Sequence, residues 1–150
     1  MNMKYQYKFE KVLTFKEREK EEALSAYQNA IKTFEEVAEE LYRLLKKKED
    51  LELFQAEKLQ TGSSVQEIRH YQRFIINMEK SIKSYQELVL NARNRMNWCE
   101  TQLIEKNVEV KKYEKMKIKD YEKFLEQMKL EEDKVTDEIS TLQYFHRTGN

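Results

Sequence analysis

The sequence predicts an all-α protein. Two long helices form an antiparallel coiled-coil hairpin, and the C-terminal end of the second helix overhangs the first. Three observations predict this fold. Apolar residues recur at heptad spacing along most of the chain, the 150 residues contain no proline and only two glycines, and the one strong break is Thr61-Gly62-Ser63-Ser64. Because proline and glycine are the residues that disfavour a helix interior most, this composition favours long helices.

The clearest heptad pattern lies between residues 68 and 113. Its a positions are Ile68, Ile75, Ile82, Val89, Met96, Leu103 and Val110. Its d positions are Tyr71, Met78, Tyr85, Ala92, Cys99, Lys106 and Tyr113. Thirteen of these fourteen positions are apolar, in a chain that is 39% apolar. A 3.5-residue period held this long is typical of a helix packed along a partner in a left-handed coiled coil.

A second seam precedes the first. Seven successive positions at the same spacing are Leu24, Tyr27, Ile31, Phe34, Ala38, Leu41 and Leu45. Beyond Leu45 this register would place Lys48, Glu52 and Gln55 on the seam, whereas Leu44, Leu51 and Phe54 offer another stripe. The sequence therefore predicts a heptad break near residue 45.

The break at residues 61–64 is predicted to be a tight turn. Gly62 suits the left-handed position that ends a helix, and Ser64 followed by Glu67 is typical of a capping box. We expect a single domain over residues 1–150, with one helix at about 8–60 and another at about 65–145. A turn this short favours an antiparallel hairpin.

The expected hairpin leaves the end of the second helix without a partner. If the turn is centred near residues 62–63, facing residues have numbers that sum to about 125, so the first helix ends opposite about residue 117. A skipped heptad step near Lys117 leads to an apolar face, here called the C-terminal stripe: Ile118, Tyr121, Leu125, Met128, Val135, Ile139 and Leu142. Within the chain, only the aromatic leader Tyr5, Tyr7 and Phe9 can pack against it. Because most helical stability comes from a buried apolar face, we expect this stripe to dock on another protein.

Composition excludes several functions. The 28 basic and 28 acidic residues cancel, so the chain lacks the basic excess of a nucleic-acid binder. Cys99 is the only cysteine and occupies a d position, which indicates a buried core residue in a reducing compartment. The sequence contains no metal-ligand spacing, phosphate loop or catalytic constellation, so we expect no cofactor and no enzyme activity. It also lacks a signal peptide and a membrane span, which predicts a cytosolic protein.

A second candidate surface, here called the turn-side ridge, lies near the predicted turn. It comprises Phe74, Met78, Ser81 and Tyr85, with Leu44 and Leu51 facing them from the first helix. These residues either broaden the coiled-coil core or form an exposed apolar patch that binds a partner.

Two segments resemble the FliJ family of the bacterial flagellar type III export apparatus. They are the residues from Gly62 to Ile82, which begin Gly-Ser-Ser-Val-Gln-Glu-Ile-Arg-His-Tyr, and the leader Phe9-Glu-Lys-Val-Leu-Thr-Phe-Lys-Glu-Arg. The resemblance implies a hairpin similar to the stalk of the rotary ATP synthase γ subunit. It also implies that the turn-side ridge engages the cytoplasmic domain of the export gate protein FlhA. The open end would sit in the hexameric export ATPase through Val12, Leu13, Phe15, Tyr121, Leu125, Met128 and Val135.

The resemblance implies a non-enzymatic coupling or chaperone component that links the export ATPase to the export gate. Export chaperones are further expected partners, and membrane contact is expected only through the gate, at the cytoplasmic face of the flagellar base. The alternative is a structural coiled-coil scaffold or holdase that self-associates through its overhanging end.

Overall fold

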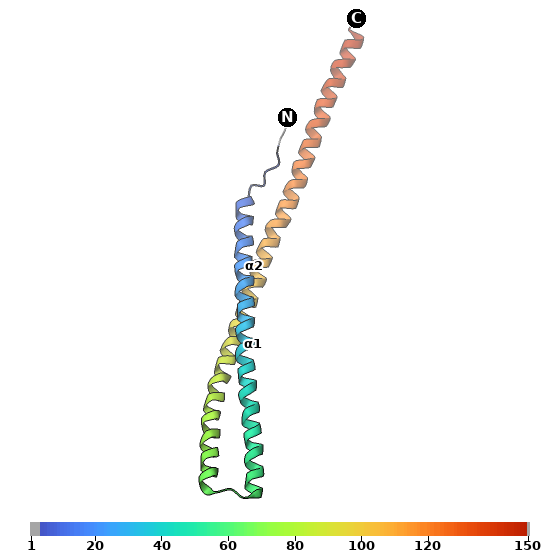
Figure 1. Cartoon of the computed structure of the whole chain (residues 1–150). Helices are drawn as coiled ribbons and strands as arrows, with labels where there is room; N and C mark the ends of the chain where they lie inside the picture. The colour runs from blue at the N-terminus through green and yellow to red at the C-terminus, as the bar shows by residue number, and fades with distance from the viewer. Residues whose placement is uncertain (1–3, 150) are drawn as a thin grey trace. The chain divides into compact units, whose positions relative to one another are not determined.

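The computed structural model describes residues 4–149, which form two helices and no strand. Helix α1 spans Glu10–Thr61 and helix α2 spans Val65–Thr148 (Figure 1). The prediction of an all-α protein with two long packed helices is confirmed. Neither helix contains a stretch that is apolar and long enough to cross a membrane.

The chain divides into two compact units. One contains Glu21–Ile104 and therefore the turn, and the other contains Met1–Lys20 together with Glu105–Asn150. Each unit is described by itself below. The single domain expected over 1–150 stays a prediction.

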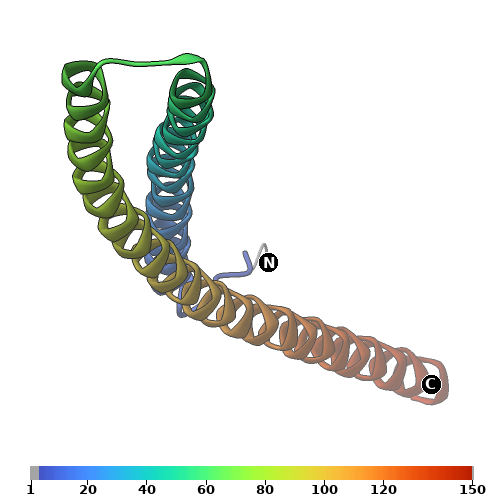
Figure 2. The same cartoon turned by 90° about the horizontal axis from the view of Figure 1, so that it is seen from below.

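The turn ends α1 at the predicted glycine. Gly62 has a φ of 100°, a conformation that residues with a Cβ rarely adopt. Figure 2 shows the short turn that joins the two helices. The Glu67 amide donates a hydrogen bond to the Ser64 hydroxyl at 3.2 Å, as in the predicted capping box. The Glu67 carboxylate differs from the prediction because it accepts a bond from the Ser63 hydroxyl at 2.9 Å.

The seam predicted on α2 is confirmed. All fourteen a and d positions between Ile68 and Tyr113 are buried or half-buried. Cys99 is 1% exposed, and Met78 and Ile82 are each 6% exposed. Within residues 21–104, Phe54 packs edge-on against Tyr71 near the turn, and Lys48 pairs with Glu79 at 3.4 Å further from it. These pairs follow the facing rule expected for antiparallel helices.

The seam predicted on α1 needs a correction. The half-buried and buried positions of this unit recur without a break at Ala23, Tyr27, Ala30, Phe34, Val37, Leu41, Leu44, Lys48, Leu51 and Gln55. The heptad break expected near residue 45 is therefore wrong. The predicted seam places one position in each heptad one residue too late, and at Leu24 and Ile31 it prefers the larger residue to the alanine before it. Leu24 and Leu45, for example, are 41% and 42% exposed, whereas Ala30 is 5% exposed.

In the other unit the leader and the start of α1 pack on α2. Tyr7, Leu13 and Val110 form a small buried core, and Tyr5, Phe9 and Tyr113 pack around it. Ion pairs flank this core between Lys106 and Glu19 at 2.7 Å, Lys16 and Glu109 at 3.5 Å, and Lys117 and Glu10 at 2.8 Å.

The predicted skip of the seam near Lys117 is wrong. Lys117 stays half-buried and pairs with Glu10, whereas Ile118 is 59% exposed. The covered face continues to Phe124, which is half-buried. The polar residue Lys117 is accommodated because its charge has a partner and its stem covers apolar surface.

Candidate partner-binding surfaces

The turn-side ridge contains both core and surface residues. Met78 is buried, and Tyr85, Leu44 and Leu51 are half-buried on the two seams. Ser81 is exposed, and Phe74 is 42% exposed. The buried and half-buried residues of the ridge therefore belong to the coiled-coil core, while Phe74 and Ser81 remain accessible to a partner.

Lysines of α1 border this ridge. The Lys47 ammonium lies 5.7 Å from the centre of the Phe74 ring, within cation–π range. Lys48, which occupies a seam position, pairs with Glu79 at 3.4 Å and with Glu52 at 3.6 Å. A partner that covers Phe74 would therefore also meet positive charge.

Several exposed apolar side chains of this unit are not among the sequence-based candidates, including Leu45, Ile76 and Trp98, which is 59% exposed. Leu45 is 42% exposed because it flanks the seam of α1, and Ile76 is 52% exposed on α2. The sequence could have indicated the exposure of Leu45, because Leu44 occupies the seam and two adjacent helix residues cannot both point straight at the partner helix.

The residues predicted at the open end of α1 differ in accessibility. Leu13 is 4% exposed within the small core, so its side chain cannot touch a partner unless the leader moves. Val12 is half-buried, and Phe15 is 57% exposed. Of these three, Phe15 is the one that presents most of its side chain to solvent.

The C-terminal stripe is covered only at its beginning. The Tyr5 ring packs edge-on against Tyr121 at 5.0 Å between centroids, and it lies 5.3 Å from the ring of Phe124. Tyr121 nevertheless remains 44% exposed, Leu125 47% and Val135 53%, and Met128 is half-buried. Every side chain from Lys129 to Gly149 is exposed. Heptad spacing does not reveal Phe124, because this residue lies off the predicted stripe.

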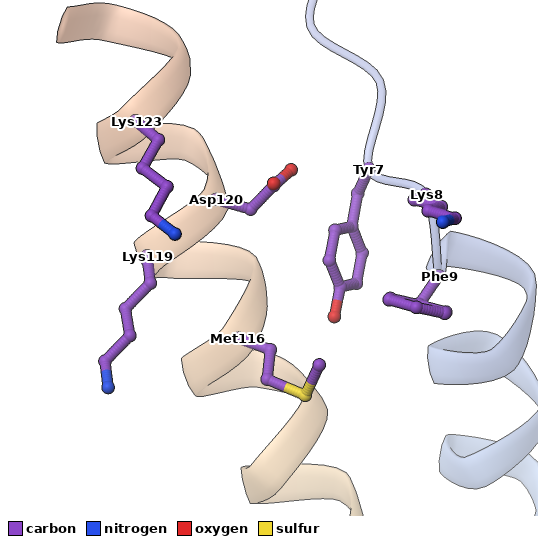
Figure 3. A pocket seen from close by; sticks show the side chains of 7 residues that line it. All are labelled: Tyr7, Lys8, Phe9, Met116, Lys119, Asp120 and Lys123. Carbon is purple, nitrogen blue, oxygen red and sulfur yellow. The ribbon is translucent and has the colours of Figure 1, made fainter.

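A hollow of about 270 Å³ lies between the leader and α2. Figure 3 shows the Tyr7 ring from the leader pointing toward Met116 of α2, with Phe9 beside it. Its other lining residues are charged: Lys8, Lys119, Asp120 and Lys123. An apolar floor with three lysines suits an acidic segment that carries an apolar side chain.

Hydrogen bonds from tyrosine hydroxyls hold the leader on α2. The Tyr5 hydroxyl lies 3.0 Å from the Asp120 carboxylate and 3.3 Å from the Lys117 carbonyl, and the Tyr7 hydroxyl donates to the Tyr113 carbonyl at 3.2 Å. Desolvation, together with the bond to Asp120, raises the pKa of Tyr5 to about 12. Desolvation also raises the pKa of Tyr7. Both hydroxyls therefore keep their protons at neutral pH and act as donors.

The ion pair between Lys106 and Glu19 explains the one polar d position of the α2 seam. The hydrogen bond from Lys106 lowers the pKa of Glu19, and the same bond raises the pKa of Lys106. The pair keeps both groups charged where a lone lysine on the seam would be unfavourable.

The acidic, histidine and cysteine side chains of the described residues do not gather into a metal-binding group. Among residues 4–149, no group of three or more histidine, cysteine or acidic side chains is arranged to hold a metal ion.

Comparisons with known proteins agree with this geometry. The sequence model of the family described as Flagellar FliJ protein matches residues 4–149. The chain is 48% identical over 142 residues to the Flagellar FliJ protein of Bacillus subtilis (strain 168), covering 95% of this chain and 97% of that protein. A solved YscO homologue from Chlamydia trachomatis has a similar fold, with a TM-score of 0.74, 19% identity and coverage of 98% of this chain and 99% of that one. Since the family match spans nearly the whole chain, the protein belongs to the FliJ family of flagellar proteins.

Proposed function

We propose that this protein is a non-enzymatic component of flagellar type III protein export that couples the hexameric export ATPase to the export gate. In this proposal it is an antiparallel coiled-coil hairpin with an overhanging C-terminal helix. It acts in the cytoplasm and reaches the membrane only through the cytoplasmic domain of the gate protein FlhA. Family membership supports the export role.

The observation that carries the proposal is the exposure of the C-terminal stripe. Leu125, Val135, Ile139 and Leu142 are 47–69% exposed, although they keep heptad spacing with one another. A regular apolar face on a helix is stabilised when another protein covers it. We assign this face, together with Phe15, to the export ATPase.

The turn-side ridge is the proposed contact with the gate. Phe74 combines a large apolar ring with substantial exposure, which is the character of an interface anchor. The two surfaces belong to separate units, so substitutions can be placed in one contact without changing a residue of the other.

The test is to place charge on the C-terminal stripe. Leu125→Asp combined with Val135→Asp should abolish stimulation of ATP hydrolysis by the full chain while leaving gate binding intact. A carboxylate in a desolvated coiled-coil contact costs several kcal/mol, on the order of the whole interface energy of a short helix.

The matched control is Gln127→Asp combined with Thr136→Asp. Both residues are exposed on the same helix and lie off the stripe. This control adds the same two negative charges and places the same weak helix former, aspartate, in the same helix. Stimulation should survive in this control. Equal activity of the two double variants would contradict the assignment of the stripe.

The alternative function, a self-associating scaffold or holdase, is favoured by the same exposed stripe. It predicts that the chain prevents aggregation of unfolded clients without any ATPase. The stripe variant should then lose that protection while the wild-type chain leaves ATP hydrolysis unchanged.

A further inference from the structure

The C-terminal stripe keeps a heptad register through residues 118–142, and its one polar position is Glu132. A register of this kind specifies a second helix alongside. The leader touches this face through the contact of Tyr5 with Tyr121, whereas Leu125, Val135, Ile139 and Leu142 are exposed.

Charge along the same helix is divided into two blocks. Residues 111–123 contain six lysines and three acidic residues, and residues 126–138 contain six acidic residues and two lysines. Two copies side by side in the same direction would bring like blocks together. Two copies in opposite directions would bring the basic block of each against the acidic block of the other.

We propose that two copies of this chain form an antiparallel dimer through the C-terminal stripe, with the basic block of each copy facing the acidic block of the other.

The heptad positions agree with one such register. When facing residue numbers sum to about 253, an a position of one copy meets a d position of the other over residues 118–135. Ile118 then meets Val135 of the second copy, Leu125 meets Met128, and Tyr121 lies beside Glu132. In the same register Glu122 lies beside Lys129 of the second copy, which gives a flanking pair of opposite charge.

The leader limits where the second copy can lie. Tyr5 covers an edge of Tyr121, and α2 presents Phe124 toward the leader. Ile118 and Leu125 are 59% and 47% exposed, so the face required by the dimer remains open.

The test uses two charge-reversal variants of the full chain. The first changes Glu122 to lysine, and the second changes Lys129 to glutamate. Both side chains are exposed, and neither makes an ion pair in the structure, so the fold should tolerate both variants.

Sedimentation equilibrium of the wild-type chain should show a dimer in low salt that weakens as salt is added. Each variant alone should raise the dimer Kd about three- to tenfold, because the two symmetry-related pairs of residues 122 and 129 become repulsive. An equimolar mixture of the two variants should recover association, since each substituted residue then faces an opposite charge in the other copy. A wild-type chain that stays monomeric up to about 100 μM, or variants that dimerise as well as wild type, would overturn the proposal.

Direction is measured with a spin label on Thr141→Cys. Cys99 is 1% exposed and therefore stays unlabelled. In the antiparallel register Thr141 faces about residue 112, so the two labels should lie about 45 Å apart at 1.5 Å per residue. A distance below about 20 Å would indicate parallel chains and refute the arrangement.

The dimer and the proposed ATPase contact use the same stripe, but the experiments separate them. Sedimentation and spin labelling use the chain alone, so a monomer would overturn the dimer and leave the ATPase contact standing. A failed ATPase assay would have the opposite effect.

Discussion

Truncation of Phe74 separates a core role of the turn-side ridge from a binding role. The ring is 42% exposed, so somewhat more than half of the benefit of a fully buried phenylalanine is at stake, about 1–1.5 kcal/mol. Loss of the cation–π contact with Lys47 adds about 0.5 kcal/mol at an exposed site. Phe74→Ala should therefore destabilise the fold by about 1.5–2 kcal/mol, which lowers Tm by about 3–8 °C for a chain of this size.

The same substitution should weaken gate binding much more visibly. If the ring is an interface anchor, its loss costs about 2 kcal/mol or more of binding free energy, which raises Kd about thirtyfold. The assay is titration of the full chain with the soluble cytoplasmic domain of FlhA, at a temperature well below the melting transition of both variants.

Ile82→Ala is the control for this experiment. Ile82 is 6% exposed on the seam, so its truncation should cost about 2–5 kcal/mol of stability and leave the Kd of the folded fraction unchanged. If Phe74→Ala bound the gate domain with wild-type affinity, Phe74 would be a core residue and the contact would lie elsewhere. The reasoning would also fail if Phe74→Ala melted as far below wild type as Ile82→Ala.

Three further predictions concern the turn and the leader. Gly62→Ala should lower the free energy of unfolding by about 1–2 kcal/mol, seen as a lower Tm, because a φ of 100° is unfavourable for alanine. An added Cβ meets no atom within 4 Å, so this cost comes from the backbone conformation alone, and Gly62→Asn should lose less because asparagine tolerates the left-handed region. Glu19→Gln should lower Tm at neutral pH, because the hydrogen bond from Lys106 holds the pKa of Glu19 below its usual value and so stabilises the fold while the carboxylate is charged. The deficit should shrink as pH falls below about 4.5 and vanish once pH passes below the lowered pKa of Glu19. Tyr5→Phe should lower Tm below about pH 10, because a raised tyrosine pKa stabilises the fold only while the hydroxyl keeps its proton. In an ultraviolet absorbance titration, the same substitution should remove the tyrosine whose pKa is raised to about 12.

Periodicity predicts α2 far better than α1. Its seam is made of large apolar residues separated by polar ones, so a single register fits, and all fourteen positions are covered. On α1 two registers compete, because apolar residues stand in adjacent pairs such as Leu44 and Leu45. Hydrophobicity favours the larger residue of a pair, whereas close packing of two helices favours a small one such as Ala30.

The contacts of the leader could not be predicted from the sequence, for a different reason. Tyr5 and Tyr7 are held by hydrogen bonds to a carboxylate and to backbone carbonyls of α2, more than 100 residues away. A heptad pattern reports the spacing of apolar residues within one helix and carries no information on such hydrogen bonds. It therefore identifies the leader as a possible cover for the stripe and misses Phe124, which the leader also touches.

The polar seam positions near the turn have a consequence for motion. Between Glu49 and Asn77 no side chain is buried, and the α1 seam there includes Gln55, which lies one heptad after the paired Lys48. Local unfolding should therefore start at the turn, where opening exposes the least apolar surface, and amide hydrogens there should exchange with solvent faster than those around Ile82 and Cys99. The segment that presents Phe74 would thus be the part of Glu21–Ile104 most able to change its shape while the remainder stays folded.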